Sequence, residues 1–472
     1  MSEKAVLIDG RTVEYLPDMI GEGAMKEVFF TKDHSSVVCF FKNTQDPYRQ
    51  DRLESVLGRF NPLTGTSGTY WHDYFCWISG IVISPRLGII APAYPKNFFF
   101  QSGPFKGKEK EGTWFFGRKT RPLLPAQELG TWLNYFLICI RLARAIRRLH
   151  QAGLAHSDLS PKNVLIDPTT GRCSVIDIDS LVVPGIYPPD VLGTRNYMAP
   201  EVIISCHLPL NDLQKKTPSI RTDLHALATL IYQYLFYRHP LQGPKVHAAN
   251  TAEEQEILEM GTKALFIEHP SDKSNRPKSF GVSCTALGPF LYDLFIRAFV
   301  TGLHSPDDRP SAGEWEKALY RTWDALVPCP GTSCSHNWMV LYDQSHCKCP
   351  FCGYKLSGAW PLLSLRTERR QGQWVSDGQL TVYANGQISQ GLYKWHVKGG
   401  EPRAEGADTK RQAYFALHQG KWLLVNEHLV SLKSPAGNHV PPGSAIELKD
   451  GMQFMLSTGD QGRLAFVQML HF

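Results

Sequence analysis

The sequence lacks the features that mark several classes of protein. Its first ten residues carry charges and no apolar core of a signal peptide, so we expect no secretion signal. No internal repeat of 20–50 residues is visible, which argues against solenoids and propellers. The most apolar long stretch, residues 129–149, is interrupted by Asn134, Arg141, Arg144, Arg147 and Arg148. Its helical spacing predicts a buried amphipathic helix and not a membrane span.

The chain also lacks a strong excess of charge of one sign. Its 50 basic and 44 acidic side chains give a net charge of +6, which does not by itself favour nucleic acid or a membrane surface. We therefore expect a cytoplasmic protein that binds neither. A length of 472 residues is too great for one hydrophobic core and predicts two to four domains.

The eleven cysteines do not have the distribution of a disulfide framework. Scattered single cysteines in a cytosolic chain are usually small buried hydrophobes. Five others crowd between Cys329 and Cys352, which is typical of a metal site. The scattered ones are Cys39, Cys76, Cys139, Cys173, Cys206 and Cys284.

Two cysteine pairs in this cluster, Cys329 with Cys334 and Cys349 with Cys352, can place four thiolates around a tetrahedral Zn²⁺ ion. The first pair is spaced more widely than usual, and Cys347 and His336 are rival ligands. Reduced free thiols are the alternative. We predict a small zinc-ribbon-like module over residues 326–356, with a structural Zn²⁺ that folds a segment too short for its own core.

Two segments near the start of the chain suit contact with phosphates. In Gly21–Val28 (GEGAMKEV), Gly21 and Gly23 allow a hairpin backbone to approach a ligand closely, although a plain turn is the alternative. Lys26 stands where a G-x-G-x-x-G pattern has its third glycine. Residues 37–42 (VVCFFK) then form an apolar strand that ends in Lys42, whose charge can be directed at phosphates.

Two acidic segments follow the long helix. In His156–Asn163 (HSDLSPKN), Asp158 can orient or deprotonate an acceptor hydroxyl, and Asn163 can hold a magnesium ion. Asp177, at the end of the strand-like run 174–179 (SVIDID), can be a second magnesium ligand. The alternative in both places is an ordinary polar turn.

Further motifs complete a pattern. Gly193–Glu201 (GTRNYMAPE), Asp223 and Arg309 follow in this order. Together, at these distances, the motifs resemble the protein-kinase superfamily over about two-thirds of the chain. The resemblance implies an α+β, bilobal protein-kinase-like fold over residues 1–325, with an N-lobe (1–95) and a C-lobe (96–325).

The resemblance also implies roles for residues around the nucleotide. Gly21, Gly23 and Val28 would cover it, while the backbone at Ala91 and Ala93 would hold the adenine. Lys42 would pair with the α- and β-phosphates, and Glu54 would be its ion-pair partner; Asp51, the only other acid on that stretch, is less well spaced.

Other implied roles belong to the reaction itself and to its support. Asp158 would be the catalytic base, and Lys162 could reach the γ-phosphate of ATP. Asn163 and Asp177 would bind Mg²⁺ (or Mn²⁺). Three residues are implied to be structural: Glu201 as a partner of Arg309, and Asp223 as a prop for the catalytic loop.

Besides Lys26, three positions depart from the family pattern. Ser157 replaces the arginine that normally pairs with a phosphorylated activation loop, so we do not expect activation by loop phosphorylation. Ser160 replaces the usual lysine. Asp179 replaces the glycine of the D-F-G motif and is either an additional metal ligand or a solvated turn residue.

Finer details resemble bacterial, eukaryotic-like Ser/Thr kinases of tellurite-resistance-associated phosphorylation triads. The segments that carry this resemblance are Gly21–Thr31, His239–Leu241 and Phe266–Pro277. Its implied partners are a PP2C-type phosphatase and a von Willebrand A-domain protein. The alternatives to a protein kinase are a pseudokinase scaffold that binds nucleotide and a small-molecule kinase; Ala199–Glu201 favours protein substrates.

The C-terminal part has a different pattern. Residues 366–373 read as a polar linker, and short β-rich runs separated by turn residues follow from Trp374. This predicts an all-β sandwich over residues 374–472. Pro441–Leu456 and, weakly, Ile388–His396 resemble parts of a forkhead-associated (FHA) domain, without a clear arginine for phosphothreonine. An unrelated β-sandwich used for protein contacts is the alternative.

Overall fold

The computed structural model describes residues 2–23, 25–42, 46–64, 70–117, 119–183, 186, 189, 192–247, 249–398, 410–459 and 462–472. The chain divides into two units. The first comprises Met1–Gly281 and Asp293–Glu316, and the second comprises Val282–Tyr292 and Lys317–Phe472.

The first unit begins with a closed barrel in the strand order β1-β2-β3-β4-β6-β5. Alternate apolar residues of these strands fill its interior, where Tyr15, Phe29 and Phe40 meet edge to face with ring centroids 5.3–5.8 Å apart. The bounds are β1 (Glu3–Leu7), β2 (Thr12–Glu22), β3 (Lys26–Thr31), β4 (Ser36–Phe41), β5 (Gly80–Ser84) and β6 (Gly88–Pro92), with helix α1 (Arg49–Leu57) between β4 and β5.

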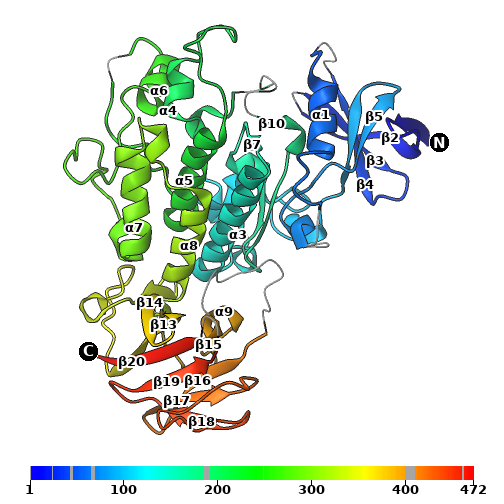
Figure 1. Cartoon of the computed structure of the whole chain (residues 1–472). Helices are drawn as coiled ribbons and strands as arrows, with labels where there is room; N and C mark the ends of the chain where they lie inside the picture. Colours follow the sequence, from blue (N-terminus) through cyan, green and yellow to red (C-terminus); the bar gives the residue numbers. More distant parts are fainter. Residues whose placement is uncertain are drawn as a thin grey trace. The chain divides into compact units, whose positions relative to one another are not determined.

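Two long helices form the centre of the remainder of this unit. The helices α3 (Trp132–Gln151) and α5 (Ile220–Phe236) lie side by side (Figure 1), and Trp132 Nε1 donates a hydrogen bond to the Leu235 carbonyl at 3.0 Å. Most of α3 is buried, which confirms the predicted buried helix. The shorter helices are α2 (Thr113–Phe116), α4 (Pro200–Ile204) and α6 (Ala252–Met260), while α7 (Pro289–Ile296) and α8 (Ala312–Trp323) each have residues in both units.

By length and composition alone, the helical stretch Ala126–Gln151 could cross a membrane. However, 61% of its most apolar window is buried inside the protein, as in the core helix of a globular protein. The stretch is therefore weak evidence for a membrane span.

Small strands after α3 position the polar motifs of the sequence. Strand β7 (Ala155–His156) pairs with β10 (Leu181–Val182), and β8 (Val164–Asp167) pairs with β9 (Arg172–Val175) in a hairpin. The loop from β7 to β8 carries Asp158, and the segment from β9 to β10 carries Asp177. The β7–β10 pairing and the β8–β9 hairpin thus bring the segments that carry Asp158 and Asp177 to one region.

A buried ion pair ties α4 to the segment before α8. Arg309 is 4% exposed, and its guanidinium Nη1 and Nη2 donate to the two Glu201 carboxylate oxygens at 2.8 Å each. Its remaining donors reach the carbonyl oxygens of Gly302, Arg221 and Leu303. The predicted pairing of Glu201 with Arg309 is confirmed.

Replacing Glu201 with alanine should lower the free energy of unfolding by about 3–5 kcal/mol, because a buried charge loses its counter-ion. Urea unfolding followed by tryptophan fluorescence measures the change. The control is Glu14→Ala, which removes an exposed partner of Lys32 and should change stability by about 0.5 kcal/mol or less. Equal losses in the two variants would contradict the assignment of a buried pair.

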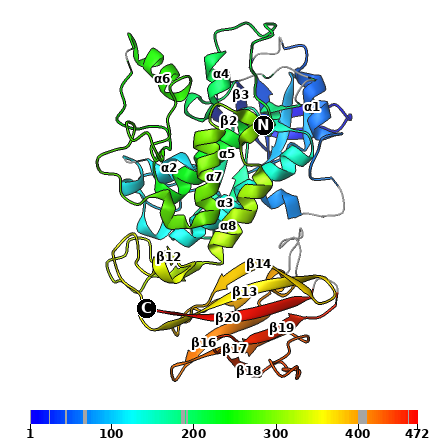
Figure 2. The same ribbon diagram turned by 60° about the vertical axis from the view of Figure 1, so that its left-hand side comes forward.

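The second unit contains a β-sandwich whose two four-stranded sheets have the orders β14-β13-β20-β19 and β15-β16-β17-β18 (Figure 2). Its core includes Leu363, Phe415, Leu424 and Val467, which come from both sheets. The bounds are β13 (Ala359–Arg370), β14 (Gln373–Thr381), β15 (Gly391–Leu392), β16 (Ala413–His418), β17 (Lys421–Asn426), β18 (Ala445–Glu447), β19 (Gln453–Ser457) and β20 (Arg463–His471), with a short helix α9 (Lys394–Val397).

The predicted linker at residues 366–373 is wrong. Strand β13 runs through Arg370 and pairs with β14 and β20, so the polar residues belong to an antiparallel sheet. Leu365 and Thr367 are buried, whereas Arg366 and Glu368 on the alternate face are less buried. A strand with one solvated face reads as polar when only composition is considered.

The cysteine-rich segment precedes the sandwich. It contains the paired strands β11 (Leu326–Pro328) and β12 (Trp338–Val340). Its small core joins Val327, Met339 and Leu341 to Cys334 and Cys349. Sulfur atoms therefore occupy part of the interior of a segment that has few apolar residues of its own.

Candidate active site

The loop between β7 and β8 holds two of the predicted site residues together. Asn163 Nδ2 donates to the Asp158 backbone carbonyl at 2.8 Å and to Asp158 Oδ2 at 3.2 Å. The amide thereby fixes the turn and one carboxylate oxygen. Because Nδ2 is the donor in both bonds, Asn163 Oδ1 is the atom that can coordinate a cation.

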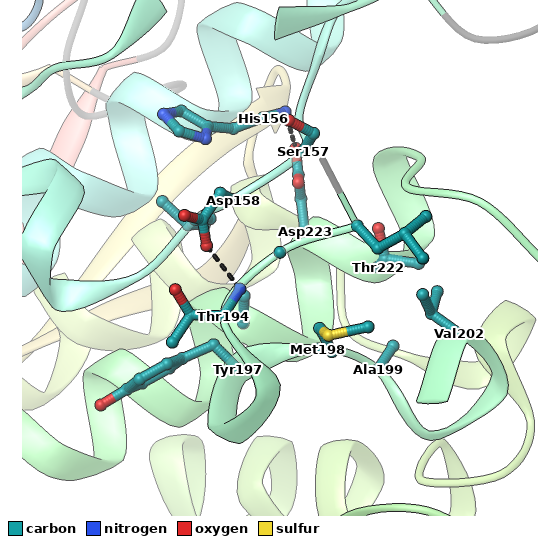
Figure 3. Close-up of a pocket in the computed structure, with 14 residues that line it drawn as sticks. His156, Ser157, Asp158, Thr194, Tyr197, Met198, Ala199, Val202, Thr222 and Asp223 are labelled. Carbon is teal, nitrogen blue, oxygen red and sulfur yellow. Dashed lines mark hydrogen bonds between the residues drawn. The ribbon is translucent and has the colours of Figure 1, made fainter. Parts of the chain in front are cut away.

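The second oxygen of the same carboxylate is fixed from a distant segment. Asp158 Oδ1 accepts a hydrogen bond from the backbone N–H of Thr194 at 2.7 Å, and both residues line the same small pocket (Figure 3). Gly193 has φ +108°, and a Cβ there would lie 3.0 Å from the Ser157 carbonyl oxygen. Glycine at 193 thus permits the close approach that delivers the Thr194 N–H.

Buried polar residues hold the loop between β7 and β8 in place. Asp223 is 1% exposed, and its Oδ2 accepts the backbone N–H of His156 at 2.8 Å and contacts His150 Nε2 at 3.0 Å. The prediction that Asp223 props this loop is confirmed. Ser157, in the position of the family's arginine, donates its hydroxyl to the Ser180 carbonyl at 2.8 Å.

Asp177 lies beside Asn163 because of the β8–β9 hairpin. Val164 pairs with Val175, and the Ile176 N–H donates to the Asn163 carbonyl at 3.0 Å. Asp177 adopts a left-handed conformation with φ 61° and ψ 42°, which is uncommon for a residue other than glycine and recurs at functional sites. A carboxylate and an amide oxygen are suitable ligands for a magnesium ion, so the donor set fits that metal.

Lys26 from the β2–β3 hairpin contacts this acidic segment. Its Nζ lies 2.7 Å from Asp177 Oδ1 and 2.7 Å from Asp179 Oδ1. Asp179 is 8% exposed, so the suggestion that it is a solvated turn residue is wrong. Burial disfavours the Lys26 ammonium, but the two carboxylates outweigh it and raise the pKa of Lys26. Burial likewise acts to raise the pKa of Asp177, yet the Lys26 ammonium brings the pKa below its ordinary value.

The structure does not bring Lys42 and Glu54 together among the described residues. Lys42 follows β4 on the surface, and its Nζ forms an ion pair with the Glu22 carboxylate. Glu54 is exposed on α1 and accepts a hydrogen bond from Gln50 Nε2 at 2.9 Å. The buried side of α1 carries Arg52 and other residues instead, so the predicted counter-ion faces away from the interior.

The two predicted glycines lie in a tight hairpin. Gly21 pairs with Val28, and the Gly23 N–H donates to the Lys26 carbonyl at 2.9 Å. Ala24 lies outside the described residues. The hairpin therefore has the form that the sequence predicted, and it presents Lys26 next to the turn.

The structure also shows the surroundings of the other residues predicted to contact the nucleotide, namely Ala91, Ala93 and Lys162. Ala91 pairs with Val37 inside the sheet, and the Ala93 N–H donates to the Ser35 carbonyl at 3.0 Å, so this donor is already engaged. Tyr94 and Cys76 pack against a cluster of Phe98, Leu165 and Ile176, which provides an apolar surface next to that segment. Lys162 is exposed, and its charge counteracts the burial that raises the pKa of Glu111.

In the second unit, Cys329, Cys334, Cys349 and Cys352 bring their sulfur atoms within 4.8 Å of one another. The Sγ–Sγ distances are 3.6 Å for Cys329–Cys352 and 3.8 Å for Cys334–Cys349. Tetrahedral coordination at about 2.3 Å separates sulfurs by roughly 3.8 Å, so the set fits Zn²⁺. A Cβ on Gly331 would lie 2.8 Å from Cys352 Sγ, which explains a glycine in the first turn.

The rival ligands are not part of this set. Among the described residues, the four-sulfur group includes neither Cys347 nor His336. The His336 ring stacks on Phe351 with centroids 3.7 Å apart. The geometry therefore favours the four cysteines that the spacing indicated.

Sequence reasoning missed the contact between Lys26 and the two aspartates. Lys26 was noted only as the residue that replaces a glycine. The available signal was its position: Lys26 and Val28 are two residues apart on a strand, and alternation places both on one face.

Comparisons with known proteins agree with this geometry. Residues 134–293 match the family model of the protein kinase domain. This segment includes Asp158, Asn163, Asp177, Glu201 and Asp223, whose contacts are described above.

Several curated kinases are similar over part of the chain. Dual specificity protein kinase TTK of Mus musculus is 28% identical over 180 residues, which are 34% of this chain and 20% of that protein. Serine/threonine-protein kinase MPS1 of Saccharomyces cerevisiae is 30% identical over 156 residues, 30% of this chain and 18% of that protein. Serine/threonine-protein kinase PknD of Chlamydia abortus is 24% identical over 258 residues, 49% of this chain and 25% of that protein.

The chain thus spans a quarter or less of the length of these relatives. The family model covers the segment that holds the acidic motifs and Asp223. Such a domain has the bilobal kinase fold and uses ATP with Mg²⁺. Residues 134–293 of this chain are thus similar to the protein kinase domain, and the relatives that match part of the chain include kinases described as serine/threonine-protein kinases.

Proposed function

We propose that this chain is an ATP-dependent serine/threonine protein kinase that transfers the γ-phosphoryl group of ATP to protein hydroxyls. One observation carries the proposal: both oxygens of the Asp158 carboxylate are oriented by separate donors, Thr194 N–H and Asn163 Nδ2. A carboxylate held in this way beside a pocket is suited to orient a substrate hydroxyl.

In this proposal Asp158 is the catalytic base. It accepts the proton of the acceptor hydroxyl as the new oxygen–phosphorus bond forms and the bond between the β- and γ-phosphates breaks, which releases ADP. Each oxygen of an ionised carboxylate has two lone pairs, so the two existing hydrogen bonds leave room for the hydroxyl.

Asn163 and Asp177 are the proposed ligands of Mg²⁺ (or Mn²⁺). When bound, the ion offsets the negative charge of the phosphates. The Asn163 amide has a second task, because the same side chain orients Asp158 through Nδ2. Loss of Asn163 would therefore disturb both the ion and the base.

Protein substrates are favoured over small molecules by the segment that follows Gly193. Ala199–Glu201 leads into α4, and Arg309 anchors this region through Glu201. Relatives described as serine/threonine-protein kinases support a hydroxyl acceptor of that type. A nucleotide-binding scaffold is disfavoured because Asp158, Asn163 and Asp177 are all present and brought together.

The finer assignment rests on the sequence resemblance described above. We propose a cytoplasmic bacterial enzyme of a tellurite-resistance-associated triad, with a PP2C-type phosphatase and a von Willebrand A-domain protein as partners. In the second unit we propose a structural Zn²⁺ on the four cysteines and an FHA-like role in protein contacts for the β-sandwich.

Incubation of the full chain with γ-labelled ATP and a generic protein acceptor tests the proposed activity. We expect label on serine and threonine in the presence of Mg²⁺ and none in the presence of EDTA, with acid hydrolysis identifying the acceptor residue. Label that is independent of the metal, or that appears only on a small molecule, would refute the proposal.

A further inference from the structure

The strand register of the β3–β4 hairpin determines on which face of the sheet Lys26 lies. In the strand pairing, Val28 lies opposite Cys39 and Lys26 lies opposite Phe41. Directly opposed residues of an antiparallel pair share one face of the sheet. Lys26 and Cys39 therefore lie on the same face.

The opposite face of this hairpin is the interior of the barrel. Val38 and Phe40 are buried there together with Phe29. Because side chains alternate along a strand, Lys42 has the parity of Val38 and Phe40 and not that of Cys39. It leaves the sheet at the strand end, where it forms the exposed ion pair with Glu22.

The face that carries Lys26 is the one that meets the acidic segment. The Lys26 side chain is 19% exposed, and its ammonium contacts Asp177 and Asp179. Cys39, on the same face, has its pKa raised to about 12 by burial, and the charges of Lys26 and Asp179 act on it as well. The ammonium thus lies next to the carboxylate to which we assign the metal.

Asp179 supplies the counter-ion that α1 does not. Both of its oxygens accept from Lys26 Nζ, at 2.7 and 2.9 Å. On the buried side of α1 the polar residues are Arg49 and Arg52, which are cations. An acid two residues after Asp177 therefore replaces the acid that the family resemblance expects on the helix.

We propose that Lys26, held by Asp179, is the catalytic lysine that contacts the phosphates of the nucleotide, and that Lys42 has no part in this contact. The inference rests on the proposed kinase function and names the residue for one of its steps. An ammonium has three donors, and here they reach Asp177 Oδ1 and both Asp179 oxygens. Lys26 can therefore donate to a phosphate oxygen by releasing Asp177 while it keeps its bonds to Asp179.

Five variants of the full chain test this assignment: Asp179→Asn, Lys26→Met, Lys26→Arg, Lys42→Met and Lys32→Met. The last is the matched control, because Lys32 is an exposed lysine at the end of the same hairpin and pairs with Glu14. Two readouts are needed, namely the dissociation constant of ATP by calorimetry, with and without Mg²⁺, and kcat/KM for phosphoryl transfer. Circular dichroism melting shows that each variant is folded.

Lys26→Met should lower kcat/KM by about 10²–10³-fold and weaken ATP binding by roughly tenfold. Lys26→Arg should recover part of the lost affinity because it retains the charge. Lys42→Met should lose less than about threefold in either quantity, in line with a surface ion pair. Asp179→Asn should reduce kcat/KM without removing the lysine, since it weakens the hold on Lys26.

A large loss in Lys42→Met together with control-like behaviour of Lys26→Met would overturn the assignment. So would unchanged ATP affinity and unchanged kcat/KM in a folded Lys26→Met protein. If the wild-type chain transfers no phosphate, the proposed kinase function fails, and the affinity measurements still decide between Lys26 and Lys42.

Discussion

Replacing Asp158 with asparagine is expected to reduce kcat for phosphoryl transfer by about 10²–10⁴-fold, the usual contribution of a general base. Asparagine preserves the size of the side chain and can still accept the Thr194 N–H through its amide oxygen. It cannot accept a proton from the substrate hydroxyl. The loss should therefore appear in the chemical step, while the dissociation constant of ATP changes less than about threefold.

Initial rates with labelled ATP and titration calorimetry separate these two effects. Asp212→Asn is the matched control, because this residue caps an exposed turn by accepting the Gln214 N–H at 2.7 Å. Its rate should equal that of the wild type. An Asp158→Asn protein that retains full activity would show that the base is elsewhere, and a parallel loss of nucleotide affinity would indicate that the substitution distorts the site.

Removal of zinc should unfold the cysteine-rich segment of the second unit. Structural zinc sites contribute about 10–16 kcal/mol to the folding of small domains, far more than the few apolar residues here can supply. We expect one zinc per chain by elemental analysis. Cys349→Ser should lose the metal and lower the melting temperature of the full chain, because Cys349 is 1% exposed within the segment's core.

Two other cysteines make the experiment specific. Cys347→Ser tests the rival ligand inside the cluster, and Cys206→Ser tests a half-buried cysteine of the first unit. Both variants should retain one zinc per chain. Loss of zinc from Cys347→Ser would show that Cys347 is a ligand in place of one of the four proposed cysteines. A wild-type chain without zinc would show that the four cysteines are reduced thiols.

The parts of the site that could be predicted from the sequence are those that fold locally. Asp158 and Asn163 are five residues apart in one loop, and the loop itself brings them together. Asp177 follows through the short β8–β9 hairpin, whose register depends on neighbouring residues. The cysteine set was also predictable, because the spacing within each pair limits which sulfurs can meet.

The assignment of Lys42 and Glu54 depended on information that short motifs do not contain. A shift of one residue along a strand moves a side chain to the other face of the sheet. Lys26 lies opposite Phe41, so Lys42, one residue further on, has the parity of the other face. Glu54 depends on which side of α1 is buried, and that side is set by residues 49, 52, 53 and 56. The interpretation of 366–373 as a linker was wrong because only the partner strands reveal that β13 is an inner strand of its sheet.

The hydrogen bond from Ser157 to the Ser180 carbonyl has a consequence for how the catalytic loop attains its form. In the kinase pattern an arginine at this position holds the loop in place only after a phosphate has been added elsewhere. Here a neutral hydroxyl makes the connection to the main chain, and Asp223 secures the residue before it. We therefore propose that the arrangement of Asp158 is acquired when the polypeptide first folds, without a later covalent event to complete it.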